Sequence, residues 1–260
     1  MTGQGVSPRL GYCSRRPDDE GGSTCDIQAP ALFAVPNKTH YNSTGFVHCS
    51  VSRISTSRYH MSFETKDAEP VSMIANKNRL SRTTNYHMFD ALRGGVDAKL
   101  SKKSGHYIGK LRLQSTGCYA LYNSNKEKKQ VAAFVYEVPD LLAQVRDGTP
   151  PRVMKAVIPD GKHSGTSCGS LIEQLRMGTW RQSNLVACQT RPPKFSDGQY
   201  RLNFSGRVLQ ASVKNFQLEN ERGEVLLQYG KVDEDTFHLD YRAPFTAYAA
   251  FGAALCQFDM

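Results

Sequence analysis

The chain has 260 residues, 39% of them hydrophobic, with 12 Phe and 12 Tyr, which is enough for one large β-domain or two small domains with a substantial core. A formal net charge of +9 favours anionic partners (nucleic acid, anionic lipid or an acidic protein) without choosing among them. The 7 scattered cysteines form no C-x-x-C pair, which argues against a disulfide scaffold and a structural zinc site and favours free thiols in a reducing cytosol.

The first segment of the chain, up to about Ala29, is rich in Gly, Ser, Pro and charged residues. This composition predicts a flexible arm over residues 1–40, followed by one domain over residues 41–260. Within it, the apolar patch Ala31–Val35 fits either docking on the domain or a plain loop. No secretory signal and no stretch of transmembrane length is visible, so membrane contact is expected to be peripheral.

Short alternating segments begin at Phe46 and predict strands separated by turns. Ser170–Trp180 is ambiguous, and Gln199–Leu218 is expected to carry two strands with a bend between Val213 and Phe216. Many short strands of this kind indicate an all-β barrel or sandwich. The remaining predicted strands are Phe46–Val51, Tyr59–Phe63, Val71–Ala75, Asn85–Phe89, His106–Leu113, Cys118–Tyr122, Val131–Tyr136, Val153–Ile158, Val225–Tyr229 and Thr236–Tyr241.

The segment Ala243–Phe258 is apolar or small on every side. A helix without a polar stripe either spans a membrane or is buried on every face, and this one is shorter than the ~20 residues of a bilayer span. Pro244 suits the first helical position. The fold class predicted is therefore mainly β: a closed antiparallel β-barrel that encloses a hydrophobic C-terminal α-helix.

One short motif raises the question of catalysis. Gly165–Gly169 fits the pattern of a hydrolase nucleophile elbow, but the elbow needs a strand directly before it, and Asp160–Ser164 reads as a loop. His163 and Cys168 are too few to make a metal site. We therefore expect no enzyme, no metal and no cofactor.

Several longer blocks resemble the tubby family: Asn203–Phe216, Leu227–Tyr241, the apolar helix ending in Phe258–Asp259, Thr84–Tyr86 and His106–Arg112. The resemblance covers roughly residues 41–260. It implies a closed barrel of about twelve antiparallel strands around the C-terminal helix, in agreement with the reading above. It also implies binding of phosphoinositides, chiefly phosphatidylinositol 4,5-bisphosphate, at the cytoplasmic face of the plasma membrane.

The family resemblance further implies where the protein acts. Family members tether themselves to the membrane in this way, and in animals they carry receptors into cilia; release from the membrane is linked to nuclear entry. We therefore expect a monomeric, cytoplasmic protein that is peripheral at the plasma membrane, with the cilium or nucleus as further locations and a membrane protein as cargo.

Lys110 and Arg112 are the main candidate ligands. They lie two apart on a predicted strand, so they share one face while Leu111 and Leu113 turn to the core. Arg offers a planar fork for bidentate phosphate contact and Lys a compact charge. In the resembled family these two positions coordinate the lipid headgroup.

Further site positions follow from the same resemblance. Asn85 matches another headgroup-contacting position but fits a turn or capping amide equally well, and Lys128 stands where the family has Arg, although Lys129 could exchange roles with it. Loop cations would strengthen adhesion to an anionic leaflet by about 1 kcal/mol each. They are Lys77, Arg79 and Arg82 in one loop, and Lys102 and Lys103 in another.

The alternative function is a nucleic-acid-binding or transcription-regulating protein that uses the basic surface. A basic lipid-binding protein also binds DNA non-specifically, so affinity for nucleic acid by itself does not separate the two readings.

Overall fold

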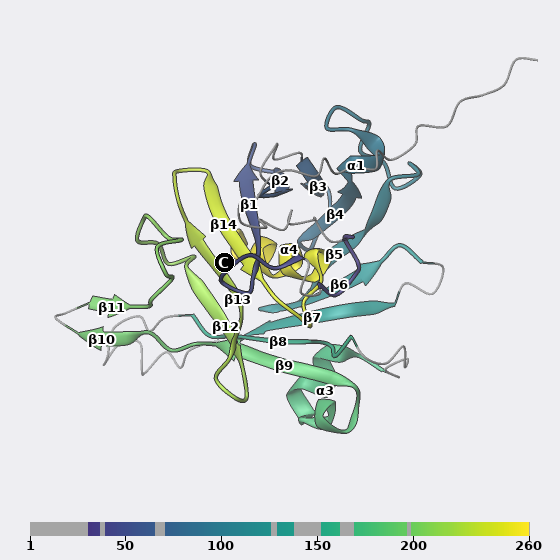
Figure 1. The fold of residues 1–260 in the computed structure, drawn as a ribbon. Coiled ribbons are helices and arrows are strands. Elements are labelled where there is room, and N and C mark those ends of the chain that lie inside the picture. Colours follow the sequence, from purple (N-terminus) through teal and green to yellow (C-terminus); the bar gives the residue numbers. More distant parts are fainter. Residues whose placement is uncertain are drawn as a thin grey trace, which may run out of the picture.

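The computed structural model describes residues 31–36, 40–65, 71–125, 129–137, 152–161, 169–196 and 199–259. Most of the predicted arm, the region 1–30, lies outside these residues. Within them, twelve antiparallel strands close into a barrel in the order β1-β14-β13-β12-β9-β8-β7-β6-β5-β4-β3-β2 (Figure 1). The predicted fold class, mainly β with a closed antiparallel barrel, is confirmed.

Most barrel strands lie within one or two residues of their predicted positions. Inward and outward side chains alternate along them; in β1, for example, Val47, Cys49 and Val51 are buried and their neighbours are less so. The barrel strands are β1 (Val47–Arg53), β2 (Arg58–Phe63), β3 (Val71–Lys77), β4 (Asn85–Asp90), β5 (Tyr107–Ser115), β6 (Cys118–Asn123), β7 (Gln130–Tyr136), β8 (Met154–Pro159), β9 (Leu185–Thr190), β12 (Phe216–Asn220), β13 (Val225–Lys231) and β14 (Thr236–Tyr241).

Two segments differ from the sequence-based prediction, and the structure shows what a third, ambiguous segment forms. The ambiguous stretch after Ser170 forms α3 (Leu171–Met177) and the 3-10 turn η2 (Thr179–Gln182), separated by Gly178 in the left-handed conformation. Strand β9 was not predicted. The stretch Gln199–Leu218 carries strand only at its two ends, in β11 (Gln199–Arg201), which pairs with β10 (Lys194–Ser196), and in β12.

The C-terminal helix α4 (Ala247–Cys256) is buried along its whole length, as the lack of a polar stripe predicts. Its residues belong to the same hydrophobic cluster as inward-facing residues of the strands, among them Leu111, Leu121 and Phe134. The expectation that Pro244 opens the helix is wrong. Thr246 is the N-cap, and its hydroxyl accepts a hydrogen bond from the Ala249 N–H at 3.1 Å.

The patch before the barrel docks on this helix. Leu32 is buried, and its carbonyl accepts a hydrogen bond from the Tyr248 N–H at 2.9 Å. The rings of Phe33 and Tyr248 lie 4.7 Å apart. Of the two readings of Ala31–Val35, docking is the one that the structure shows.

We expect Thr246→Ala to lower the free energy of unfolding by about 1 kcal/mol, because it removes the side-chain acceptor of the first turn of α4. Chemical denaturation measures this change. Thr246→Ser keeps a hydroxyl and should behave like the wild type. A Thr246→Ala protein as stable as the wild type would contradict the assigned cap.

Three further features concern the cysteines, possible metal-binding groups and the length of the helices. Cys49, Cys118, Cys188 and Cys256 are free and buried, and burial raises the pKa of Cys188 to about 12. Across the described ranges, no group of three or more side chains is arranged to hold a metal ion. The helices of the described ranges include none with the length and apolar character needed to cross a bilayer.

Candidate functional site

The pairing of β4 with β5 creates the candidate site. Asn85 lies opposite Arg112, and His87 lies opposite Lys110. Paired strands are about 4.8 Å apart and alternate residues of a strand about 6.6 Å apart, so these four side chains stand at the corners of one small patch. Tyr86 and Leu111, which alternate with them, are fully buried in the core. We call this patch, made by Asn85, His87, Lys110 and Arg112, the cationic face.

The two predicted cations have different surroundings. Arg112 is exposed, and among the described residues it has no hydrogen-bond or ion-pair partner. Lys110 is half-buried, and its Nζ lies 5.5 Å from the ring centroid of Tyr122, where the ring face attracts a cation. The Tyr122 hydroxyl accepts hydrogen bonds from Gln114 at 2.6 Å and Gln130 at 3.1 Å, so the ring beneath Lys110 is fixed in place.

Two polar atoms of the cationic face lack partners. The Oδ1 atom of Asn85 and the Nε2 atom of His87 are buried and make no hydrogen bond. A buried polar group without a partner costs free energy, and a ligand that supplies the partner recovers it. An anionic ligand carrying hydroxyl groups would suit both atoms.

Sequence reasoning missed His87. Burial, with the charges of Lys102 and Lys110, lowers the pKa of His87 to about 4, so it is neutral near pH 7. A signal was present, because His87 lies two residues after Asn85 on the same predicted strand and must therefore share its face.

The predicted loop cations divide between the two ends of the barrel. Lys77 is the last residue of β3, and the β3–β4 loop carries Arg79 and Arg82 beside Asn85 and Arg112. A cavity of about 460 Å³ lies there, lined by Ser57, Asn76, Lys77, Asn78, Arg79 and His87. Lys77 forms an ion pair with Asp259 at 2.5 Å, so a carboxylate already balances its charge, whereas Arg79 and Arg82 are exposed.

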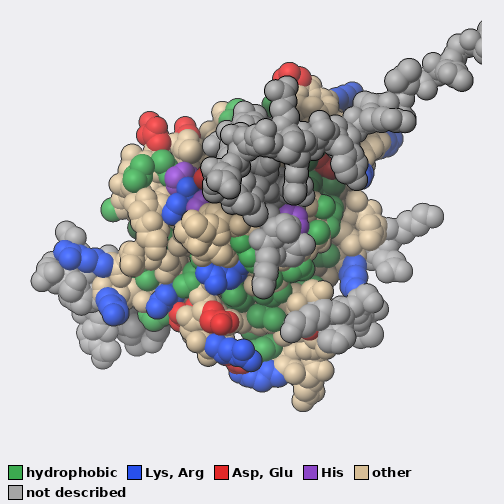
Figure 2. All heavy atoms as spheres, viewed as in Figure 1, with side chains coloured by type: hydrophobic (Ala, Val, Ile, Leu, Met, Phe, Trp, Pro, Cys, Tyr) green, Lys and Arg blue, Asp and Glu red, His purple; other side chains and the backbone are tan. Residues whose placement is uncertain are grey.

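The other predicted cations lie in loops at the opposite ends of the strands, although, in addition to burial, the Lys102 charge still lowers the pKa of His87. Lys102 and Lys103 are in the β4–β5 loop, and Lys129 directly precedes β7, where its carbonyl accepts the Asn123 N–H at 3.1 Å. Lys128 lies outside the described residues. Cations are thus spread over the molecule, and Figure 2 likewise shows Lys and Arg side chains at several separate places on one face.

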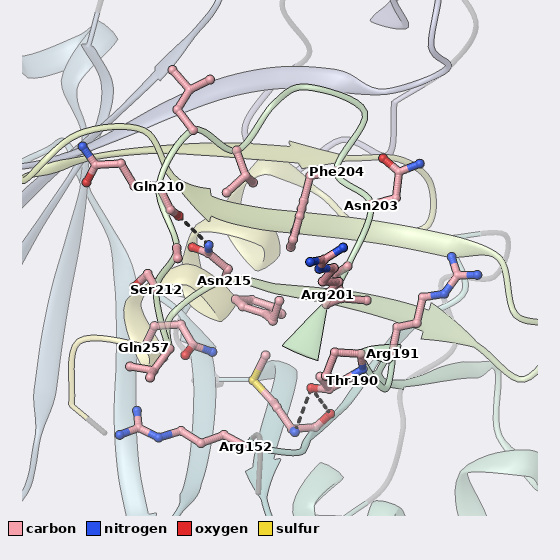
Figure 3. A pocket seen from close by; sticks show the side chains of 18 of the residues that line it. Arg152, Thr190, Arg191, Arg201, Asn203, Phe204, Gln210, Ser212, Asn215 and Gln257 are labelled. Carbon is pink, nitrogen blue, oxygen red and sulfur yellow. Dashed lines mark hydrogen bonds between the residues drawn. The ribbon is translucent and has the colours of Figure 1, made fainter. Parts of the chain in front are cut away.

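A larger cavity, of about 940 Å³, was not anticipated from the sequence. It lies between β8, β9, β12 and the segment 201–215, away from the cationic face. In Figure 3, Phe204 and Arg201 reach toward its middle, while Arg152 and Arg191 lie at its border. Its lining combines apolar side chains with these arginines, which would suit an amphipathic anion, but no described contact selects one.

The fold and the site define a class: a closed antiparallel barrel with a buried C-terminal helix and a cationic face on its outer wall. Comparison with known proteins gives the family. The sequence model of the Tub family matches residues 37–260, and the chain belongs to that family.

Relatives of known name agree. The chain is 32% identical over 214 residues to tubby-related protein 1 of Mus musculus, an alignment that covers 72% of this chain and 37% of the relative. It is 31% identical over 229 residues to tubby-related protein 3 of Homo sapiens, covering 77% and 49%. It is 29% identical over 220 residues to protein king tubby of Drosophila sechellia, covering 77% and 47%. The chain thus spans less than half the length of these relatives.

Family membership also bears on catalysis. Tubby-family homologues are not enzymes, which is consistent with the expectation for this chain. The elbow motif cannot be checked against the fold, because His163 and most of Gly165–Gly169 lie outside the described residues.

Proposed function

We propose that the cationic face binds the headgroup of a phosphoinositide, with phosphatidylinositol 4,5-bisphosphate as the first candidate, and tethers the protein to the cytoplasmic face of the plasma membrane. Membership of a family whose known role is phosphoinositide binding supports this proposal. The observation that carries it is the β4–β5 register, which brings Asn85, Lys110 and Arg112 onto one outer face.

The chemistry of the face suits vicinal phosphates. Arg112 is exposed and can form bidentate hydrogen bonds to one phosphate, while Lys110 supplies a compact charge to its neighbour. Asn85 can donate its amide N–H to a phosphate, and its unpartnered Oδ1 can accept from an inositol hydroxyl. In this proposal Lys128 or Lys129 takes the family's arginine position on the strength of the resemblance alone. A lysine there keeps the positive charge but cannot form the bidentate hydrogen bonds of a guanidinium.

Sedimentation with vesicles tests the proposal. Lys110→Ala combined with Arg112→Ala should weaken bisphosphate-dependent binding by about 100-fold or more, because each charge-assisted hydrogen bond contributes about 1.5–3 kcal/mol. The matched control is Lys194→Ala with Arg222→Ala, which also removes one Lys and one Arg, both exposed, but from β10 and the β12–β13 turn, away from β4 and β5, and it should keep most of the binding. Equal losses in the two double variants would show non-specific attraction and refute the site.

The wider roles in this proposal follow the family. Transport of a membrane-protein cargo, a ciliary location and a nuclear role are proposed on the resemblance. Nucleic-acid binding has only the net charge of +9 in its favour, so we do not propose it as the function.

A further inference from the structure

The loops at one end of the barrel present an exposed leucine beside the cationic face. Strand β3 ends at Lys77 and β4 begins at Asn85, so the loop between them ends next to the Asn85–Arg112 pair. Leu80, near the middle of this loop, is 97% exposed. Among the large hydrophobic residues that the structure describes as exposed, it has the highest exposed fraction.

The loop that carries Leu80 is held in shape. The side chain of Asn78 accepts a hydrogen bond from the Leu80 N–H at 3.1 Å, and the Asn78 N–H donates to the Asn85 carbonyl at 2.8 Å. The Arg79 guanidinium donates a hydrogen bond to the Thr56 hydroxyl in the β1–β2 loop. Leu80 is therefore presented outward by a braced turn.

The charged residues around Leu80 are all positive. The loop Asn78–Thr84 contains Arg79 and Arg82 and no acidic residue, and Arg112 lies beside its C-terminal end. On the far side of the β1–β2 loop the sign reverses, since the β13–β14 loop carries Asp233, Glu234 and Asp235. This asymmetry would tilt the β3–β5 side of the barrel toward an anionic surface.

We propose that Leu80 inserts into the interfacial region of an anionic bilayer while the cationic face holds a phosphoinositide headgroup of the same leaflet. The inference rests on the proposed function and adds an apolar contact to it. A single leucine on a narrow loop, flanked by arginines, fits the headgroup–acyl boundary of a bilayer. A stable protein interface instead needs about 800 Å² on each partner.

The test compares a membrane with a soluble headgroup. Leu80→Ser should weaken binding to vesicles containing phosphatidylinositol 4,5-bisphosphate by about tenfold or more, because moving a leucine side chain out of water is worth about that factor. Its affinity for soluble inositol 1,4,5-trisphosphate should not change. Met177→Ser is the matched control, since Met177 is 77% exposed on α3, away from this loop, and both affinities should then stay as in the wild type.

A fluorescence measurement gives a second readout. Leu80→Trp should be quenched by lipids brominated on their acyl chains when vesicles bind, whereas the native Trp180, which lies in η2, should not. A bound Leu80→Trp protein that stays unquenched overturns the inference, and so does vesicle binding of Leu80→Ser equal to the wild type. A wild-type dimer that Leu80→Ser dissociates would also overturn it, in favour of a second copy of the chain.

The two proposals fail in different ways. If the wild-type protein binds neither the vesicles nor the soluble headgroup, the proposed function is refuted and the inference falls with it. If the wild type binds both and Leu80→Ser binds both equally well, only the inference is refuted.

Discussion

Replacing Arg207 by alanine should lower the free energy of unfolding by about 3–5 kcal/mol, because it removes the cation that balances the buried Asp240 and the partly buried Glu64 carboxylates. The Arg207 guanidinium donates hydrogen bonds to Asp240 at 2.7 and 3.0 Å and to Glu64 at 2.8 and 2.9 Å. The Asp240 side chain is only 1% exposed. Although burial opposes the charge, the hydrogen bonds and charges of both carboxylates raise the pKa of Arg207.

Chemical denaturation at neutral pH measures this loss, with Arg53→Ala as the matched control. Arg53 forms an ion pair with Asp235 at 2.5 Å, but both side chains are largely exposed, at 40% and 50%. Exposed pairs of this kind are worth about 0–1 kcal/mol. If the two variants lose similar amounts of stability, the hydrogen bonds from Arg207 to Glu64 and Asp240 do not stabilise the fold as their geometry indicates.

The loss caused by Arg207→Ala should also depend on pH. Burial lowers the pKa of His48; the Asp240 and Glu64 carboxylates oppose this, and the Arg207 charge adds to it. Removing Arg207 therefore raises that pKa in the folded variant. A folded-state pKa that is higher in the variant makes it relatively more stable as pH falls, so the deficit should be smaller near pH 5.5 than near pH 8.

Local patterns predicted most of the barrel. Alternation of apolar and polar residues placed strands such as β1 and β5 to within one or two residues. The sequence does not predict strand β9 because its apolar residues do not alternate with polar ones: Leu185–Cys188 is a continuous apolar run, and α3 and η2 cover part of the outer wall there. The loop between β11 and β12 was mistaken for strand because its apolar residues, Leu209 and Val213 among them, have the spacing of a strand and yet are exposed.

The candidate site shows the same division between local and distant information. The alternation of side chains along a β-strand was enough to place Lys110 and Arg112 on one face. It could not show that Lys77 is neutralised by Asp259, because those residues lie 182 positions apart in the chain. Nor could it show that Asn85 stands opposite Arg112, since the register is set by barrel closure and by the loop between the strands.

Gly109→Ala should lower the free energy of unfolding by about 3 kcal/mol or more, since it combines overpacking with backbone strain, each worth about 1–3 kcal/mol. Gly109 has a φ of +150°, and an added Cβ would lie 2.1 Å from the Tyr122 carbonyl oxygen and 2.2 Å from the Tyr248 hydroxyl. That hydroxyl donates to the same carbonyl at 2.7 Å, which joins α4 to β6. Gly109 also directly precedes Lys110, so the substitution should displace the cationic face.

Thermal and chemical unfolding measure the effect, and two further variants locate its cause. Gly95→Ala also places alanine at a positive φ, +77°, but in open space, so it should cost only about 1–2 kcal/mol. Adding Tyr248→Phe to Gly109→Ala removes one of the two close contacts and should recover part of the loss, because the clash with the Tyr122 backbone remains. If Gly109→Ala costs no more than Gly95→Ala, or if Tyr248→Phe recovers nothing, then close packing of α4 against β5 and β6 does not account for glycine at this position.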